Sequence, residues 1–242
     1  MFVKICGITN EDDALLATAL DADALGFVFA PSQRQVHPET VRDIVRRLPR
    51  EMHGVGVFRN ERPERVVEIV GRAGLHGVQL HGAEPASEVE WIRSRVQFVI
   101  QAFAAGDPAL AGAGKSAADI ILVDSPDPGS GKVFDWRLAE GAPSGKRILL
   151  AGGLTPDNVG DAIHLVRPWG VDVSTGVERS PGRKDPAKLR RFVEAARAAA
   201  ADVADLDGPQ HGGDGHGGSR AIDLTVDEVA GVTRPWDWQI DR

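Results

Sequence analysis

Residues 147–174, RILLAGGLTPDNVGDAIHLVRPWGVDVS, form one complete strand–helix–strand pattern. The apolar runs at 147–151 and 170–174 have the length and the content of buried strands. Between them, Thr155-Pro156-Asp157-Asn158 is a helix start signal, because proline at the first helical position loses no hydrogen bond. Two short strands that are joined by a helix pair in parallel. The stretch therefore predicts an α/β fold built on a parallel sheet.

The same alternation of strand and helix recurs along most of the chain. We expect strands at Phe2–Ile8, Ala24–Ala30, Gly54–Phe58, Gly77–His81, Gln97–Phe103, Asp119–Asp124, Arg147–Ala151 and Gly170–Ser174. We expect helices at Glu11–Leu20, Pro38–Leu48, Pro63–Ala73, Pro85–Ser94, Asp107–Lys115, Asp135–Glu140, Pro156–Val166 and Pro186–Ala201. Eight such units predict a closed (β/α)8 barrel, the TIM barrel. The alternative is an open doubly wound sheet, but Gly7-Ile8-Thr9 lacks the glycine-rich phosphate loop that follows the first strand of that fold.

The composition narrows the classes of function. The 242 residues carry 28 basic and 35 acidic side chains, a net charge of −7, which disfavours a nucleic-acid binder. No apolar run reaches the roughly 18 residues of a membrane span, and the first residues lack the pattern of a signal peptide. The lone cysteine, Cys6, can form neither an internal disulfide nor a cysteine metal cluster, so we expect no metal site. These features predict a cytoplasmic protein that acts on a small molecule and binds no nucleic acid and no membrane.

The chain changes character near residue 204. We expect one barrel domain over residues 1–204 and a C-terminal extension over 205–242. Gly208–Gly218 is a low-complexity linker rich in glycine and histidine, and its His-Gly-Gly-Asp-Gly-His spacing is too weak to predict a metal site. Residues 219–242 are too few for a core of their own, so they either stay disordered or pack on the barrel or on a second subunit. Monomer and homodimer both stay open.

Strand alternation assigns the side chains that point into the barrel. The apolar neighbours face the helices, which leaves these polar or reactive side chains inside: Lys4, Cys6, Gln79, His81, Asp124, Asp172 and Ser174. Because strands one and eight are neighbours in a closed barrel, Lys4 and Asp172 can form an ion pair, with a structural or a catalytic role. Asp124 should face Cys6 across the mouth of the barrel, as expected of an acid and a base that act on different atoms.

Two loops of small residues follow strands seven and eight. In barrels of this kind, these loops bind phosphate through backbone N–H groups and a short helix N-terminus. Glycine lets the backbone approach an anion closely. We therefore predict a phosphate site at Gly152, Gly153, Ser174, Thr175 and Gly176.

An ordered set of motifs extends from the first strand to the last helix. The motifs are Lys4-Ile5-Cys6-Gly7-Ile8-Thr9, Gly26-Phe27-Val28-Phe29, Ser32-Gln33-Arg34, Gly56-Val57-Phe58, Val78-Gln79-Leu80-His81-Gly82, Asp124, Gly129-Ser130-Gly131-Lys132, Phe134-Asp135-Trp136, Gly152-Gly153-Leu154-Thr155-Pro156-Asp157-Asn158, Asp172-Val173-Ser174-Thr175-Gly176-Val177-Glu178, Pro181-Gly182 and Lys184-Asp185. Each short motif alone is weak evidence, but the ordered set is specific. It resembles the phosphoribosylanthranilate isomerase family of tryptophan biosynthesis.

The resemblance implies an isomerase that needs no cofactor. Such an enzyme carries out an Amadori rearrangement of N-(5-phosphoribosyl)anthranilate to 1-(2-carboxyphenylamino)-1-deoxyribulose 5-phosphate. By the same resemblance, Cys6 is the general base and Asp124 is the general acid. Arg34 contacts the anthranilate part of the substrate, and Asp172 is a further substrate contact.

This chemistry sets requirements on the two groups. A free thiol has a pKa near about 8.5, so Cys6 must be partly ionised, and Lys4 is a candidate to stabilise its thiolate. Asp124 must carry a proton, which a water-poor pocket or a nearby carboxylate favours. We expect His81 to be a supporting or packing histidine and Gln79 to be an interior polar side chain.

Two other functions compete with this interpretation. The first is a histidine-pathway aminoaldose isomerase, or an enzyme with both activities, but such enzymes use paired aspartates where this chain has Cys6. The second is a non-catalytic barrel whose tail recruits a partner. A barrel of that kind has no need to keep Cys6, Asp124 and both glycine loops together.

Overall fold

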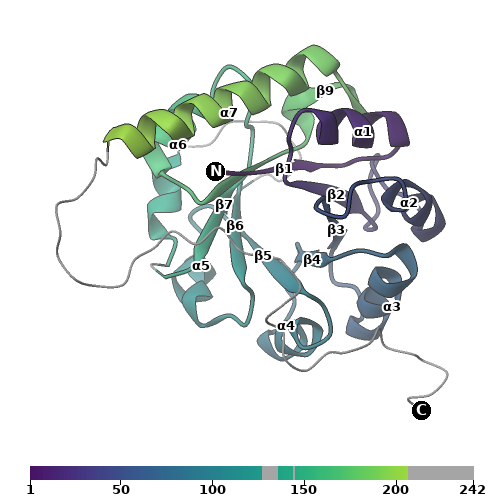
Figure 1. Cartoon of the computed structure of the whole chain (residues 1–242). Coiled ribbons are helices and arrows are strands. Elements are labelled where there is room, and N and C mark those ends of the chain that lie inside the picture. The colour runs from purple at the N-terminus through teal and green to yellow at the C-terminus, as the bar shows by residue number, and fades with distance from the viewer. Residues whose placement is uncertain (127–135, 144, 207–242) are drawn as a thin grey trace.

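The chain folds into a closed barrel of eight parallel strands in the computed structural model, which describes residues 1–126, 136–143 and 145–206 (Figure 1). Consecutive strands are neighbours, and β8 pairs with β1 to close the ring. The strands are β1 (Phe2–Cys6), β2 (Ala24–Val28), β3 (His53–Phe58), β4 (Gly77–Leu80), β5 (Phe98–Ala104), β6 (Ile120–Asp124), β7 (Arg147–Leu150) and β8 (Gly170–Val173). The predicted (β/α)8 barrel is confirmed, and the open sheet is excluded.

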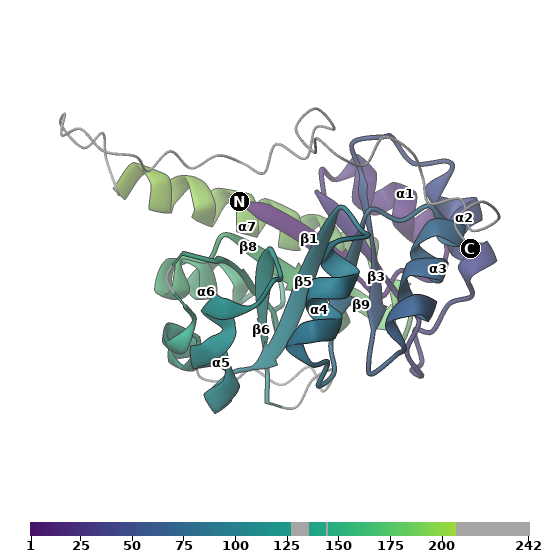
Figure 2. The same cartoon turned by 90° about the horizontal axis from the view of Figure 1, so that it is seen from below.

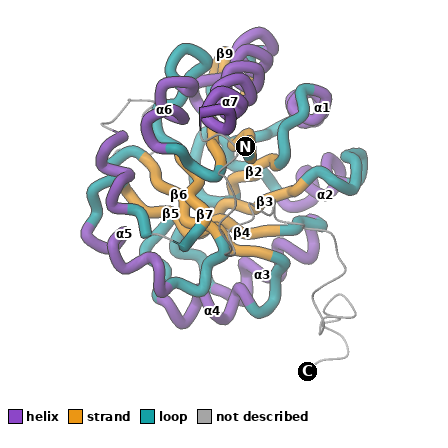
Figure 3. The backbone as a smooth tube through the Cα atoms, turned by 60° about the vertical axis from the view of Figure 1, so that its left-hand side comes forward, coloured by secondary structure: helices purple, strands orange, loops and turns teal. Residues whose placement is uncertain are grey.

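The helices surround the strands on the outside of the barrel (Figures 2 and 3). They are α1 (Glu11–Ala19), α2 (Pro38–Val45), α3 (Pro63–Ala73), α4 (Ala86–Arg93), α5 (Pro108–Gly112), α6 (Val159–Val166) and α7 (Pro186–Leu206). Short 3₁₀ helices are η1 (Ala113–Lys115), η2 (Trp136–Gly141) and η3 (Thr175–Val177), and a small hairpin joins β9 (Glu178–Ser180) to β10 (Arg183–Lys184). None of the described helices is long and apolar enough to span a membrane.

Helix α3 illustrates how the sequence forms this outer layer. Proline occupies its first turn, where the missing N–H costs no hydrogen bond, and Gly74 ends it in the left-handed conformation with a φ of +69°. Val66, Ile69, Val70 and Ala73 recur at helical spacing and are the residues that it buries. Burial of each branched side chain stabilises the fold by about 1.5–3 kcal/mol, which fixes this face against the sheet.

Helix α6 begins three residues later than the sequence predicts. Asn158 accepts a hydrogen bond from the Thr155 N–H at 2.7 Å and donates one to the Gly153 carbonyl at 3.0 Å. These side-chain bonds fold residues 155–158 as a turn, so Pro156 precedes the helix instead of opening it. The turn also holds the loop that follows β7.

Other differences lie at the ends of elements. The expected helix over 107–115 is divided into α5 and η1, and the expected helix over 135–140 is the 3₁₀ helix η2. Helix α7 continues to Leu206, past the expected domain boundary at residue 204. The expected linker, the tail after it and the Gly129–Lys132 motif lie outside the described residues.

The barrel interior is apolar in its middle layers. The buried cluster there includes Phe98, Ile100, Ile120, Leu122 and Leu149. Their sequence neighbours on the same strands instead join the larger cluster between strands and helices. The predicted alternation of faces is therefore confirmed. The polar side chains that it placed inside occur mainly toward the carboxyl ends of the strands, where the pocket described below opens.

Candidate active site

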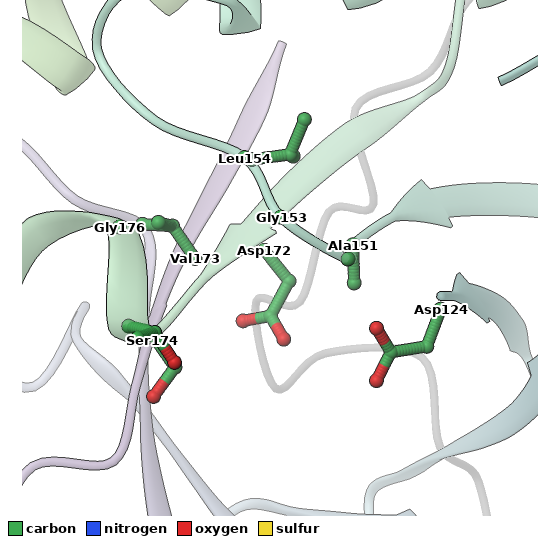
Figure 4. Close-up of a pocket in the computed structure, with 10 residues that line it drawn as sticks. Asp124, Ala151, Gly153, Leu154, Asp172, Val173, Ser174 and Gly176 are labelled. Atoms are coloured by element: carbon green, nitrogen blue, oxygen red, sulfur yellow. The ribbon is translucent and has the colours of Figure 1, made fainter. Parts of the chain in front are cut away.

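A pocket opens at the carboxyl ends of β6, β7 and β8. It is lined by Asp124, Ala151, Gly152, Gly153, Leu154, Asp172, Val173, Ser174, Thr175 and Gly176. Seven of the nine residues that the sequence predicts for the site are among these. Figure 4 shows the carboxylates of Asp124 and Asp172 directed into the same space. Cys6 and Arg34, the other two predicted residues, are not part of this lining.

The two glycine loops come together on one wall of the pocket. Gly152 and Gly153 both have positive φ values, +83° and +67°, which residues with a Cβ atom rarely adopt. A Cβ atom on Gly176 would lie 1.9 Å from the Leu154 carbonyl oxygen. Glycine is therefore needed for the loop after β8 to pack against the loop after β7. The predicted phosphate residues are brought together as expected.

Among the described residues, the Asp124 carboxylate has two polar neighbours. Its Oδ1 accepts a hydrogen bond from the Ser125 N–H at 2.7 Å, and its Oδ2 lies 3.3 Å from His81 Nε2. The other ring nitrogen of His81 lies 2.9 Å from Gln79 Nε2. His81 thus contacts the Asp124 carboxylate, and its supporting role stays a prediction. Gln79 does more than fill space, because it orients the ring that contacts Asp124.

Lys4 and Asp172 form the ion pair that barrel closure predicts. Lys4 Nζ lies 2.9 Å from Asp172 Oδ1, and the two residues are paired in the register of β1 and β8. Burial by itself lowers the pKa of Lys4, but Asp172 and Cys6 outweigh it and raise the pKa above its ordinary value. Lys4 is therefore a buried, charged ammonium, and Asp172 carries its charge to the edge of the pocket.

Cys6 lies beside this ion pair and is 7% exposed. A Cβ atom on Gly26, its partner on β2, would lie 2.7 Å from the sulfur, so only glycine leaves room for the thiol. Burial raises the pKa of the thiol, with Asp172 adding to the effect, and the opposing influence of Lys4 and Lys184 is smaller. Lys4 favours the thiolate, as the sequence predicts, but burial of the sulfur and the nearby Asp172 outweigh it, so the pKa of the thiol lies above its ordinary value.

Arg34 is held at the edge of the pocket by Glu178. Arg34 Nε donates to Glu178 Oε1 at 2.8 Å, and Nη2 donates to Oε2 at 2.7 Å. Nη2 also lies 3.3 Å from the hydroxyl of Thr175, which lines the pocket. A Cβ atom on Gly7 would lie 2.6 Å from Arg34 Cδ, so the arginine packs directly against the residue after Cys6. Cys6 and Arg34, the two predicted residues that do not line the pocket, therefore lie next to residues that do: Cys6 beside Asp172, and Arg34 beside Thr175.

Sequence reasoning missed the importance of Glu178 and Lys184. Both are buried, Glu178 at 7% and Lys184 at 1% exposure, although they occur in a short hairpin beyond β8. Their motifs, Val177-Glu178 and Lys184-Asp185, are visible in the sequence. No hydrophobic periodicity marks these residues as buried, so the only available signal was a pair of opposite charges inside loops at the carboxyl end of the barrel.

A closed barrel of this type, with two carboxylates and two glycine loops around a pocket at the carboxyl ends of its strands, belongs to the class of phosphate-binding (β/α)8 enzymes. Comparison with known proteins narrows the class. The family model described as N-(5'-phosphoribosyl)anthranilate (PRA) isomerase matches residues 3–195. This chain therefore belongs to the N-(5'-phosphoribosyl)anthranilate isomerase family.

Individual relatives agree with this assignment. The N-(5'-phosphoribosyl)anthranilate isomerase of Desulforudis audaxviator is 48% identical over 204 residues, which cover 81% of this chain and 98% of the relative. A solved phosphoribosyl anthranilate isomerase in complex with reduced 1-(o-carboxyphenylamino)-1-deoxyribulose 5-phosphate is 39% identical, with a TM-score of 0.72, and covers 82% and 99% of the two chains. A solved structure of monomers generated from the dimeric isomerase of Thermotoga maritima has the same identity of 39%, the same TM-score of 0.72 and the same coverage of 82% and 99%.

Proposed function

We propose that the described pocket isomerises N-(5-phosphoribosyl)anthranilate to the aminoketose 1-(2-carboxyphenylamino)-1-deoxyribulose 5-phosphate, with Cys6 as the base and Asp124 as the acid. That the chain is an isomerase of tryptophan biosynthesis follows from its family. Cys6 and Asp124 are assigned these roles because Asp124, Asp172 and the two glycine loops line one pocket, and Cys6 interacts with Asp172 beside it.

The substrate phosphate binds at the glycine loops. Gly152, Gly153, Thr175 and Gly176 present backbone at one wall of the pocket, and backbone N–H groups in such loops bind phosphate oxygens. The relative that was solved with a reduced sugar-phosphate product supports a phosphorylated ligand in this family. With the phosphate at this wall, the sugar extends toward the two carboxylates.

The first chemical step is the opening of the sugar ring. Asp124 in its carboxylic acid form gives its proton to the ring oxygen, and the bond between C1′ and that oxygen breaks as the anilino nitrogen donates its electron pair. A Schiff base forms and Asp124 becomes a carboxylate. His81, 3.3 Å from Asp124 Oδ2, is placed to receive a hydrogen bond or to donate one as the carboxyl group changes its charge.

The second step removes the proton from C2′. The Cys6 thiolate takes this proton, the electron pair moves toward the nitrogen, and the enolamine that forms tautomerises to the ketone. Because burial raises the thiol pKa, the ionised fraction at neutral pH is below the few per cent of a free thiol, but the thiolate is a stronger base. Lys4 and Lys184 favour this ionised form.

Replacing either group tests the roles. With substrate generated in the assay and its fluorescence followed, Cys6→Ala and Asp124→Asn should each lose at least about 100-fold in kcat, as acid–base groups usually contribute about 10²–10⁴. Asp12→Asn, at an exposed position on α1, is a matched control and should keep full activity. A loss of less than about tenfold in either site variant would contradict the assignment.

Further parts of the proposal concern Arg34, assembly and location. We infer that Arg34 binds the carboxylate of the anthranilate ring, since its side chain packs against Gly7, the residue after Cys6, and its guanidinium contacts Thr175 of the pocket. Monomer and homodimer both stay predictions, although a relative from Thermotoga maritima is dimeric. The cytoplasmic location also stays a prediction.

A further inference from the structure

A buried lysine connects three segments around the site. Lys184, on β10, has a side chain that is 0% exposed. Its Nζ donates to the Cys6 carbonyl oxygen at 2.6 Å, to the Ser174 carbonyl oxygen at 3.2 Å and to Glu178 Oε1 at 3.2 Å. Three oxygen acceptors match the three N–H donors of an ammonium, whereas a neutral amine would direct a lone pair at one of them. Burial lowers the pKa of the Lys184 amine, but Glu178 opposes that effect and the three acceptors favour the ammonium form.

The same carboxylate also binds Arg34. Glu178 Oε1 accepts from both Lys184 Nζ and Arg34 Nε, while Glu178 Oε2 accepts from Arg34 Nη2. The Arg34–Glu178 pair has no net charge by itself. With Lys184 included, the group of three carries a net charge of +1. A guanidinium whose charge is cancelled by its own partner binds another carboxylate poorly, so the second cation is what leaves a positive charge for a ligand.

The geometry also leaves donors for a ligand. Glu178 occupies the Nε–Nη2 edge of the guanidinium. Among the described residues, Arg34 Nη1 donates to no partner, so both of its N–H groups remain for a carboxylate. The guanidinium is thus fixed on one edge and open on the other, and its side chain is 17% exposed.

We propose that Lys184 is a positioning residue that determines the selectivity of the site for the carboxylate of its substrate, because its charge balances Glu178 and leaves that of Arg34 for the anthranilate ring. This inference rests on the proposed role of Arg34. Lys184 does not touch the reacting atoms. It acts through Glu178 on Arg34, whose guanidinium adjoins the pocket.

Inhibition by two related compounds measures this selectivity. The first is reduced 1-(o-carboxyphenylamino)-1-deoxyribulose 5-phosphate, an analogue of the product. The second is the same molecule without the carboxylate on its aromatic ring. The ratio of their inhibition constants reports the contribution of the carboxylate alone, since the phosphate and the sugar are common to both. Effects of a substitution on folding or on the phosphate site cancel in this ratio.

Three variants separate charge from structure. Lys184→Met should reduce the carboxylate selectivity by at least about tenfold and raise KM more than it lowers kcat. Glu178→Gln in the same chain removes the second charge, restores the net charge of +1, and should recover the selectivity to within about threefold of the unsubstituted protein. The double variant still lacks the hydrogen bonds to the Cys6 and Ser174 carbonyls, so those bonds cannot cause the recovery. Lys188→Met, at an exposed lysine that donates to the Glu178 carbonyl, is the matched control and should leave the selectivity unchanged.

The outcomes are distinguishable. Unchanged selectivity in Lys184→Met, or a double variant no better than the single one, would overturn the proposal. If Lys184→Met fails to fold, which melting curves reveal, Glu178→Gln is compared with the double variant instead. Because Lys184 acts through the Glu178 charge, these two proteins should differ in selectivity by less than about threefold, and a larger difference would overturn the proposal. No turnover by the unsubstituted protein would refute the proposed function, and turnover without carboxylate selectivity would refute the role of Arg34.

Discussion

Replacing Lys4 by methionine should destabilise the barrel through the carboxylate that loses its partner. Lys4 Nζ lies 2.9 Å from Asp172 Oδ1, and the two side chains are 0% and 9% exposed. Methionine keeps much of the aliphatic stem of lysine, so the main loss is the charge. The substitution therefore leaves the Asp172 carboxylate nearly buried and without its ammonium.

The expected size of the effect follows from two opposing terms. At an effective dielectric constant of about 20, two unit charges at this separation attract by about 6 kcal/mol, and desolvation of both ions offsets much of that attraction. Removing one partner of a buried pair costs about 3–5 kcal/mol, because the other charge stays buried. We expect the free energy of unfolding to fall by that amount and Tm to fall by roughly 10 °C in a domain of this size.

Urea unfolding followed by circular dichroism measures the loss. The double variant Lys4→Met/Asp172→Asn removes both charges and should recover more than half of it. A single variant that loses less than about 1 kcal/mol would refute the reasoning, as would a double variant no more stable than the single one. The rate of Cys6 alkylation against pH gives an independent readout in the same protein: since Lys4 opposes the raised thiol pKa, its removal should move that pKa further up.

Three further predictions concern the same site. The pKa of Lys4 is raised on folding, so its contribution to stability is present below the unfolded pKa of about 10.4 and is lost as pH rises through the higher folded value. In urea titrations, the difference in stability between the unsubstituted protein and Lys4→Met should therefore be flat from pH 7 to 9 and should shrink above about pH 10. Gly176→Ala places a Cβ atom 1.9 Å from the Leu154 carbonyl oxygen, so inhibition by inorganic phosphate should weaken at least about tenfold, and unchanged inhibition would argue against the phosphate site. His81→Leu removes the ring that lies 3.3 Å from Asp124 Oδ2 and should lower kcat about tenfold with little change in KM. Gln79→Leu keeps the ring but removes the side chain that contacts its other nitrogen. A folded Gln79→Leu protein should lose as much activity only if the orientation of the ring carries the effect.

The sequence predicts the barrel well because its signals are local. Each strand is an apolar run with a side chain period of two, and the position of Leu122 inside and of Val123 outside follows from that period alone. Closure by β8 and β1 then requires Lys4 and Asp172 to meet, as they do. Helix ends are predicted less well, since the turn that delays α6 depends on the particular hydrogen bonds of Asn158.

The candidate site is predicted only in part, because some of its features come from tertiary contacts. Composition and spacing cannot show that one carboxylate, Glu178, lies between two cations, or that Lys184 reaches the carbonyl of Cys6 from a hairpin almost 180 residues along the chain. The thiol pKa is a further example. A lysine two positions away favours the thiolate, but the balance depends on burial and on Asp172, and neither can be derived from the motif.

In the proposed mechanism, a thiolate at Cys6 removes the C2′ proton after Asp124 has opened the ring. Substrate deuterated at C2′ tests it most directly, because only the step at Cys6 breaks that bond. In Cys6→Ser, kcat should fall at least about 100-fold and a primary isotope effect should become fully expressed, whereas Asp124→Asn should lose as much activity without such an increase, since ring opening then limits the rate. A Cys6→Ser protein that keeps more than a tenth of its activity, or one that turns over both isotopic substrates at the same rate, would contradict the account.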